Sequence, residues 1–231
     1  MYYAALLISI GFLFVLTGVK QGELGWLLAW LGCNFVVTGF GYWNIGSKIF
    51  GKRESGTLPL WSKIFHLPYL LCSWSIWRLI RLFSKEPPYH HVTESLAIGR
   101  RLLPHEKPNG FVNWVDLTAE FTEPEPIRQD VNYICLPILD GGIPSEKDIT
   151  TAIRQIKEGS TYIHCAQGHG RTAIFAILLM HDRGRVRNYE EALDLLRRAR
   201  PAVSLNKRQE RFVTNYLQTI SQPMSPKNEI P

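Results

Sequence analysis

The sequence predicts a small α/β domain, with a central sheet flanked by helices, preceded by a hairpin of two apolar helices. Two patterns in the 231 residues predict this. The first 45 residues contain two long uncharged runs. From about residue 92, short segments rich in β-branched and aromatic residues alternate with amphipathic ones, which is typical of an α/β layer. An apolar content of 45% is enough to build a packed core.

The two uncharged runs cover residues 4–19 and 24–45. Crossing ~30 Å of hydrocarbon takes about 20 apolar residues, so the second run is long enough and the first suffices if extended to Tyr2. We therefore expect residues 1–46 to form a transmembrane helical hairpin. Small residues would let its two helices approach closely, namely Gly32, Thr38, Gly39 and Gly41. A cleaved signal peptide is the competing interpretation, but a basic start is missing and a second apolar run follows at once.

The positive charge of the chain is confined to its N-terminal third. Residues 1–85 carry eight Lys or Arg and two acids, whereas residues 86–231 carry 18 of each. This distribution argues against a nucleic-acid-binding domain, which needs a basic face on its folded body. It suits contact with anionic membrane lipids.

The orientation of the hairpin follows from the basic residues that come directly after its second run, Lys48, Lys52 and Arg53. By the positive-inside rule both termini should face the cytoplasm. We expect a multi-pass integral membrane protein whose C-terminal domain is cytoplasmic, in the inner or plasma membrane if the source is bacterial.

Residues 47–88 form a basic, aromatic-rich segment between the hairpin and the domain. Within it, residues 58–83 combine tryptophans with Lys and Arg, which favours a helix in the membrane interface, broken at Pro68. A third membrane helix is the alternative. Pro87 and Pro88 mark the break into the domain.

Residues 89–221 are expected to form the α/β domain. Its strands are predicted at Leu96–Gly99, Phe111–Leu117, Val131–Ile138 and Thr161–His164. Its helices are predicted at Ser145–Lys157, with Ser145 as N-cap, and at Thr172–Asp182, Tyr189–Arg198 and Lys207–Ile220. Residues 222–231 are polar and contain proline, which predicts a disordered tail.

The loop between the last predicted strand and the next helix holds the chemistry. It begins with His164 and Cys165, and Arg171 and Thr172 open the helix. Backbone N–H groups at such a helix start converge on an anion. Together with Arg171 they favour the thiolate of Cys165, and the guanidinium fork matches two phosphate oxygens.

Two further features of the loop fit a phosphate cradle. Gly168 and Gly170 can take a positive φ and turn their N–H groups inward. The Thr172 hydroxyl can hydrogen-bond the sulfur when it leaves. The alternative, that Cys165 is a small buried apolar residue, does not account for this context. Four cysteines without a CxxC pair indicate a reducing compartment, which a thiolate needs.

The run His-Cys-x-x-Gly-x-Gly-Arg-Thr resembles the signature of the dual-specificity branch of the protein tyrosine phosphatase superfamily, in particular the phosphatases of regenerating liver. Further matches lie at Ser95–Arg100, Trp114–Thr118 and Leu136–Ser145, and the resemblance covers residues 92–220. It implies the dual-specificity phosphatase fold and a phosphoric monoester hydrolase with a phosphocysteine intermediate, needing no cofactor and no metal. The implied phosphate-binding loop is Ala166, Gln167, Gly168, His169, Gly170 and Arg171.

Asp140 is the candidate general acid, since it lies in the segment that resembles the family's acid loop. It would protonate the leaving oxygen and then activate water. Asp148 and Glu146 are the alternatives within the following helix, and an Asp that merely stabilises a turn is the other interpretation. Asp116 corresponds to a structural position.

Two residues are expected to support the reaction. His164 is expected to orient the loop through a hydrogen bond, and Gln209 resembles a residue that positions the hydrolytic water, unless it is an exposed helix glutamine. A basic cluster should form a solvated helix face, namely Arg183, Arg185, Arg187, Arg197, Arg198 and Arg200.

The substrate stays open between classes. A phosphoprotein bearing phosphotyrosine, phosphoserine or phosphothreonine is favoured slightly, because Gln167 and His169 replace the lysines of phosphoinositide-directed relatives. A phospholipid, such as phosphatidylglycerophosphate or a phosphoinositide, fits the expected contact with membrane lipids. A phospho-binding pseudophosphatase fits less well, because Cys165, Arg171 and Asp140 are all present. The sequence determines neither the oligomeric state nor a regulator.

Overall fold

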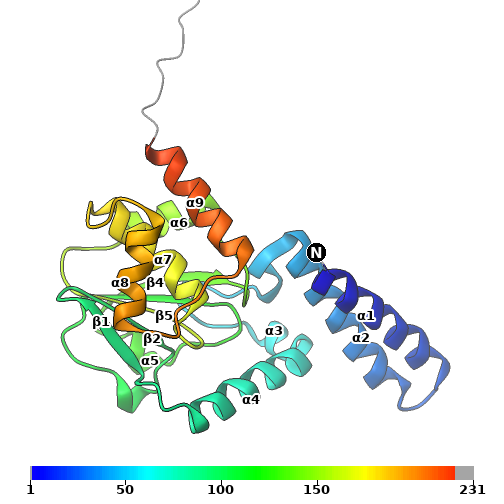
Figure 1. Cartoon of the computed structure of the whole chain (residues 1–231). Helices are drawn as coiled ribbons and strands as arrows, with labels where there is room; N and C mark the ends of the chain where they lie inside the picture. The colour runs from blue at the N-terminus through cyan, green and yellow to red at the C-terminus, as the bar shows by residue number, and fades with distance from the viewer. Residues whose placement is uncertain (1, 222–231) are drawn as a thin grey trace, which may run out of the picture.

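The computed structural model describes residues 2–221, and the tail predicted at residues 222–231 lies outside that range. Figure 1 shows a layered α/β domain from which a helical hairpin projects to one side. The helix α4 (Leu67–Phe83) runs along the edge of the domain and is followed in the chain by the first strand of the sheet. The prediction of an α/β domain with a central sheet flanked by helices is confirmed.

The sheet has five strands in the order β1-β2-β5-β3-β4. In chain order they are β1 (Tyr89–Thr93), β2 (Leu96–Arg100), β3 (Asn113–Thr118), β4 (Asn132–Ile138) and β5 (Thr161–Cys165). Only the β1–β2 pair is antiparallel; β2, β5, β3 and β4 run parallel to their neighbours. The carboxyl ends of β3, β4 and β5 therefore lie at one edge of the sheet, where open parallel sheets bind ligands.

Alternating side chains divide the core between the two faces of the sheet. Val115 and Ile163 belong to the large cluster shared with the helices α6 (Glu146–Arg154), α7 (Gly170–Asp182), α8 (Tyr189–Ala199) and α9 (Lys207–Ser221). Their neighbours Trp114 and Tyr162 point to the opposite face and pack with the short helix α5 (Glu125–Arg128). This is the period of two that a strand requires.

The predicted strands and helices of the domain are all present, with small differences at their ends. Ser145 is the N-cap of α6, as predicted, and its hydroxyl accepts from the Asp148 N–H. Regular pairing of β3 starts only at Asn113, because the N–H groups of Val112 and Asn113 both donate to the Ser160 oxygen. The edge strand β1 was not predicted, since two histidines interrupt its apolar pattern. A short helix η3 (Pro104–Glu106) follows β2.

The predicted N-terminal hairpin is present as α1 (Tyr2–Lys20) and α2 (Gly25–Phe40). Its helices meet at glycines, since a Cβ at Gly11 would lie 2.6 Å from the Gly32 oxygen. A Cβ at Gly18 would lie 2.4 Å from the Gly25 oxygen. The predicted role of Gly32 and Gly39 in close approach is confirmed, and Gly11 and Gly18 add to it.

The membrane-spanning part of that prediction is not supported. None of the helices in the part of the chain that the structure describes combines the length and the apolar character needed to cross a membrane. This holds for the predicted hairpin and for the third membrane helix considered at residues 58–83.

The segment after the hairpin is folded onto the domain. It contains the short helices η1 (Gly41–Ile45) and η2 (Gly46–Phe50), then α3 (Leu60–Phe65) and α4 (Leu67–Phe83). The break between α3 and α4 falls at His66 instead of the predicted Pro68. The reason is that proline is tolerated in the first turn of a helix, where its missing N–H has no partner.

Buried contacts join this segment to both of its neighbours. On the hairpin side, the Asn34 amide donates to the Phe65 oxygen (3.1 Å) and lies 3.0 Å from Nδ1 of His66. On the domain side, Phe50 and Leu70 pack in one cluster with Ala119 and Leu139. Residues 47–88 are therefore part of the packing of the domain.

Candidate active site

The candidate site lies at the edge formed by the carboxyl ends of the parallel strands. Cys165 is the last residue of β5, Glu120 follows β3 and Asp140 follows β4. These segments, α4 and the start of α9 enclose a pocket of about 570 Å³. The topology thus brings together residues that are far apart in the sequence.

The loop after Cys165 curls around its sulfur. The Gly168 N–H donates to Sγ at 3.2 Å. Gly168 has a φ of +78°, as predicted, and a Cβ there would lie 2.3 Å from the carbonyl carbon of Gly99 in β2. Glycine is therefore required at this position twice over, by its conformation and by its neighbour.

Gly170 has a different role from the predicted one. It does not have a positive φ but begins α7. A Cβ at Gly170 would lie 2.8 Å from Oε1 of Gln209, so its missing side chain makes room for that residue.

Arg171 is held in place by a carboxylate, Glu120, that was not predicted as a site residue. Its Nη1 and Nη2 donate to the two oxygens of Glu120, each at 2.9 Å, and Nη1 also donates to the Ile138 oxygen at 3.0 Å. Both side chains are almost fully buried. Burial alone would lower the pKa of Arg171, but Glu120 raises it well above its usual range, so the guanidinium stays charged.

Asp140 lies beside this pair and remains open to solvent. Its Oδ1 is 3.2 Å from Nη2 of Arg171, while 75% of its side chain is exposed. The loop that contains it is tied to the start of α9, because the Asn206 amide donates to the Gly141 oxygen at 2.9 Å. The Gln209 amide likewise donates to the Gly142 oxygen at 3.1 Å.

Gln209 is not the exposed helix glutamine that the sequence left possible. It is 2% exposed and lines the pocket. The two alternative candidates for the general acid lie elsewhere, since neither Glu146 nor Asp148 lines this pocket.

Two predicted contacts are not formed. The Thr172 hydroxyl is buried without a hydrogen-bond partner among the described residues, so it does not bond the Cys165 sulfur here. The ring nitrogens of His164 are likewise buried without a hydrogen-bond partner among the described residues. Its Nε2 lies 3.7 Å from Glu123 and 3.9 Å from Asp116, and the ring stacks on Tyr162.

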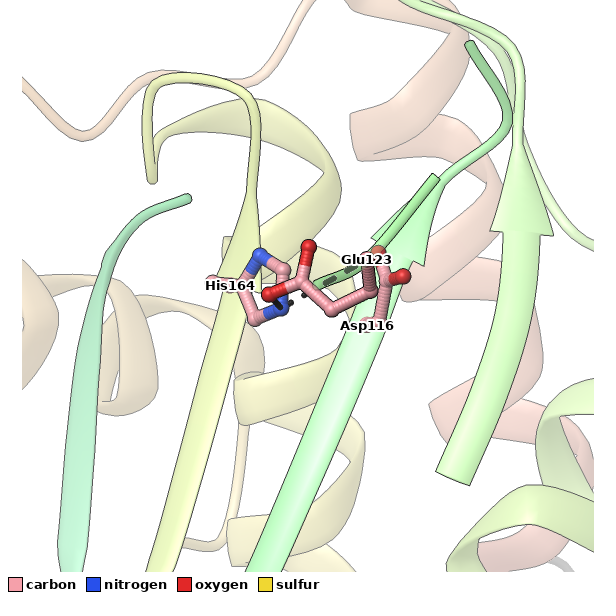
Figure 2. A group of neighbouring side chains, drawn as sticks. All are labelled: Asp116, Glu123 and His164. Carbon is pink, nitrogen blue, oxygen red and sulfur yellow. Dashed lines mark ion pairs between the residues drawn. The ribbon is translucent and has the colours of Figure 1, made fainter. Parts of the chain in front are cut away.

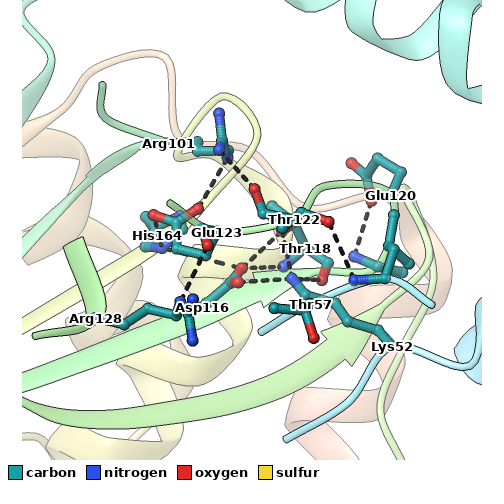
Figure 3. A network of polar contacts seen from close by, with 12 residues as sticks. Lys52, Thr57, Arg101, Asp116, Thr118, Glu120, Thr122, Glu123, Arg128 and His164 are labelled. Atoms are coloured by element: carbon teal, nitrogen blue, oxygen red, sulfur yellow. Dashed lines mark hydrogen bonds and ion pairs between the residues drawn. The ribbon is translucent and has the colours of Figure 1, made fainter. Parts of the chain in front are cut away.

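Behind the loop lies a buried polar network, drawn in Figure 3. Lys52 enters it from the segment after the hairpin, and its Nζ donates to Oδ2 of Asp116 at 2.6 Å and to the Thr118 oxygen at 2.7 Å. The Tyr133 hydroxyl donates to the same Asp116 oxygen at 2.7 Å. Burial would raise the pKa of Asp116, but Lys52 holds it well below its usual range. The structural role expected for Asp116 is consistent with this placement.

Figure 2 shows the three side chains of the described residues that lie close enough together to hold a metal ion, Asp116, Glu123 and His164. Both side chains already have a basic partner, since Lys52 lies on Asp116 and the Arg101 Nε donates to Glu123 at 2.9 Å. A divalent cation would add uncompensated charge to a buried site. This group therefore fits a buried polar network better than a metal site.

Arg200 supports the loop from the other side and corrects the prediction of a solvated basic face. It is 1% exposed, and its Nη2 donates to the Gln167 oxygen at 3.0 Å and to Glu86. Glu86 also lies 3.0 Å from Nε2 of His169. Arg197 and Arg198 of the same cluster are exposed, as expected.

The helix α4 contacts the loop directly. The Trp77 Nε1 donates to the Ala166 oxygen at 3.2 Å, and the Trp74 Nε1 donates to the Glu120 oxygen at 2.9 Å. The pattern of tryptophans with Lys and Arg predicted a membrane interface for these residues. Because both indole N–H groups donate to backbone oxygens of the domain, these tryptophans dock α4 on it. No local sequence signal distinguishes the two situations.

Among solved structures, several have the same fold over part of the chain. A mutant form of Tk-PTP is 25% identical with a TM-score of 0.51, covering 58% of this chain and 97% of that one. PTPMT1 in complex with PI(5)P is 16% identical with a TM-score of 0.51, also covering 58% and 97%. No family model and no curated protein matches the chain. The fold that the resemblance implied is confirmed for the α/β domain.

Proposed function

We propose that this chain is a cysteine-dependent phosphatase that hydrolyses phosphate monoesters through a phosphocysteine intermediate. The observation that supports it most is the arrangement around Cys165. Its sulfur accepts an N–H from its own loop, and Arg171 is fixed by Glu120 with Asp140 beside it. Each part of the site has a place in one reaction.

In the first step the Cys165 thiolate attacks phosphorus, and an S–P bond forms as the bond from phosphorus to the leaving oxygen breaks. Asp140 gives its proton to that oxygen, so an alcohol leaves instead of an alkoxide. Arg171 and the loop N–H groups bind the phosphoryl oxygens.

In the second step water attacks phosphorus, and the S–P bond breaks to restore the thiolate. Asp140 accepts the proton of that water, and inorganic phosphate leaves. Gln209, which reaches the acid loop through Gly142, is the residue proposed to position the water.

The test of the nucleophile and the acid uses two substrates, para-nitrophenyl phosphate and an alkyl phosphate. Cys165→Ser should abolish phosphate release from both, whereas Cys33→Ser, an exposed cysteine, should not. Asp140→Asn should slow the alkyl phosphate about 100-fold and the nitrophenyl ester less, because nitrophenolate leaves without a proton. Asp148→Asn is the matched control. Activity retained in Cys165→Ser would exclude the nucleophile assignment.

The substrate class belongs to the same proposal. Gln167 and His169 stand where phosphoinositide-directed relatives have lysines, which supports a phosphoprotein as the substrate. The apolar N-terminal third supports a phospholipid as the substrate. A pseudophosphatase would bind a phosphopeptide without releasing phosphate, so the same assay separates it from an enzyme.

We also propose that the hairpin attaches the domain to membrane lipids, with the domain on the cytoplasmic side. Large apolar side chains on both helices are exposed, including Leu13, Leu16, Val19, Trp26 and Leu27. The full chain should float with anionic vesicles, and a chain that starts at residue 47 should do so less. A thiol reagent confined to the outside should not reach Ser225→Cys; labelling there would contradict the cytoplasmic placement.

A further inference from the structure

The pocket above Cys165 has two unlike sides. One side is polar and consists of the catalytic loop and the residues that hold it, such as Glu120, Asp140 and Gln209. The other is provided largely by α4, through Tyr69, Cys72, Ser73, Ile76, Trp77 and Ile80. The polar side has been described above, and the α4 side has no part in the reaction.

The orientation of α4 is set by its buried face. Leu70, Trp74 and Trp77 point to the domain, and both tryptophans donate hydrogen bonds to it. At 100° per residue, a second set of apolar residues falls within an arc of about 100° beside that face. We call this set the α4 stripe: Cys72, Ile76, Leu79, Ile80 and Phe83.

The α4 stripe leads out of the pocket. Cys72, Ile76 and Ile80 line the pocket, and Phe83 is the last residue of the helix. Its large members are exposed, with 51% of Ile76 and 81% of Phe83 open to solvent. A phosphate cradle thus stands at one end of an apolar track that nothing in the described chain covers.

We infer that the substrate is a phosphate monoester attached to an apolar chain, a lipid phosphate, whose chain lies along the α4 stripe. This inference rests on the proposed phosphatase function and names its substrate class. The charged end of such a molecule matches Arg171 and the loop N–H groups. Its chain would remove the stripe from water, which is favourable in proportion to the apolar area buried.

A phosphopeptide fits this wall less well. Its backbone N–H and C=O groups need hydrogen-bond partners when they leave water. The α4 lining offers few, because the Trp77 N–H is already donated to Ala166 and the Tyr69 hydroxyl lies 3.4 Å from that of Tyr42. The hydroxyl of Ser73 is the main polar group left on it.

The test compares n-alkyl phosphates from ethyl to octyl, used below their critical micelle concentrations with the full-length chain in nanodiscs. All share the same leaving oxygen, so only chain length varies. If the chain lies on the stripe, kcat/KM should rise about two- to fourfold per added methylene. Octyl phosphate should then exceed ethyl phosphate about 60-fold or more, and should exceed a phosphotyrosine peptide.

Variants of α4 test whether the dependence on alkyl chain length arises from this helix. Ile76→Asn combined with Ile80→Asn should reduce the octyl-to-ethyl ratio to within about threefold of unity. Leu82→Asn is the matched control, since Leu82 lies on the same helix, is 76% exposed and does not line the pocket. It should keep the wild-type ratio. Because the ratio is taken within each protein, partition of the alkyl chains into the nanodisc cancels between variants.

The outcomes separate this inference from the function on which it rests. If the wild type releases no phosphate from para-nitrophenyl phosphate, the phosphatase function fails, and the substrate class with it. If it does release phosphate but the octyl-to-ethyl ratio is near unity, or the peptide is preferred, the lipid inference is overturned and the phosphatase function stands. If the octyl-to-ethyl ratio fell as far in Leu82→Asn as in the double variant, the alkyl chain would not lie on the α4 stripe.

Discussion

At the scale of single residues, the site depends on charges that are buried and paired. Arg171 and Glu120 are the clearest case, because each would be costly to bury alone. Their bidentate contact holds the guanidinium, and Asp140 lies beside it on the solvent side.

Replacing Glu120 by Gln should therefore affect both fold and activity. The amide keeps one acceptor for Arg171 but removes the charge that balances it. We expect a loss of about 2 kcal/mol in the free energy of unfolding and a fall of about tenfold or more in kcat/KM. Urea unfolding and assays with para-nitrophenyl phosphate measure the two effects. Glu125→Gln, an exposed glutamate nearby, should leave both unchanged; equal effects in the two variants would contradict the role of Glu120.

Glu123 and His164 lead to a prediction about pH. Burial raises the pKa of Glu123 from 4.5 to about 8 and lowers that of His164 from 6.5 to about 4. Between pH 4.5 and 6.5 the pair holds one proton both folded and unfolded, so its contributions cancel. From pH 6.5 to 8 the folded pair still holds one proton and the unfolded pair none, so stability falls as pH rises.

The expected loss over that window is about 2 kcal/mol, from 1.5 pKa units. Urea unfolding at pH 6 and pH 8.5 would measure it. In Glu123→Gln only the lowered pKa of His164 remains, so the fall should be replaced by a rise of less than about 1 kcal/mol over the same interval. The same slope in wild type and variant would show that the proton is held elsewhere.

At the scale of elements, the segment between hairpin and domain has the largest unforeseen role. Lys52 reaches from this segment to the end of β3, and α4 docks on the loop after Cys165. The sequence showed these residues as basic and aromatic, which is equally typical of a membrane interface.

Lys52→Met should reveal this role. It leaves Asp116 buried without its cation, which typically costs about 3–5 kcal/mol. Lys48→Met, at an exposed lysine four residues earlier, should change stability by no more than about 0.5 kcal/mol. The measurement is the urea midpoint of each variant. Adding Asp116→Asn to Lys52→Met should recover part of the loss, and equal midpoints for the two lysine variants would refute the pairing.

At the scale of the whole molecule, the folded unit begins earlier in the chain than composition suggests. Composition places the start of the domain at residue 89, but the structure packs residues 47–88 against it. The fold shared with solved structures covers 58% of the chain, yet the domain also packs against residues 47–88.

Two truncations test this. A chain that starts at residue 47 keeps Lys52 and α4 and should fold with a urea midpoint close to that of the full chain. A chain that starts at residue 89 loses them and should be largely unfolded, because the loss is comparable to the ~5–15 kcal/mol by which domains are stable. Limited proteolysis compares the two directly. Equal protection of both would mean that the domain does not need the segment.

The α/β domain and the loop after Cys165 could be predicted from local sequence. The strand before Cys165, the positive φ of Gly168 and the Ser145 cap act over a few residues, and such signals are visible along the chain. The same holds for the hairpin, whose glycines lie at its helix interface.

What only the tertiary structure decided are contacts between residues far apart in sequence. Glu120 on Arg171, Lys52 on Asp116, Arg200 on Gln167 and Trp77 on Ala166 join different segments. Each pairs a charge or N–H group with a partner 33 to 89 residues away, and nothing local distinguishes it from a solvated side chain. The physical reason is that burial, which makes these pairs necessary, is a property of the packed molecule and not of the segment that supplies the residue.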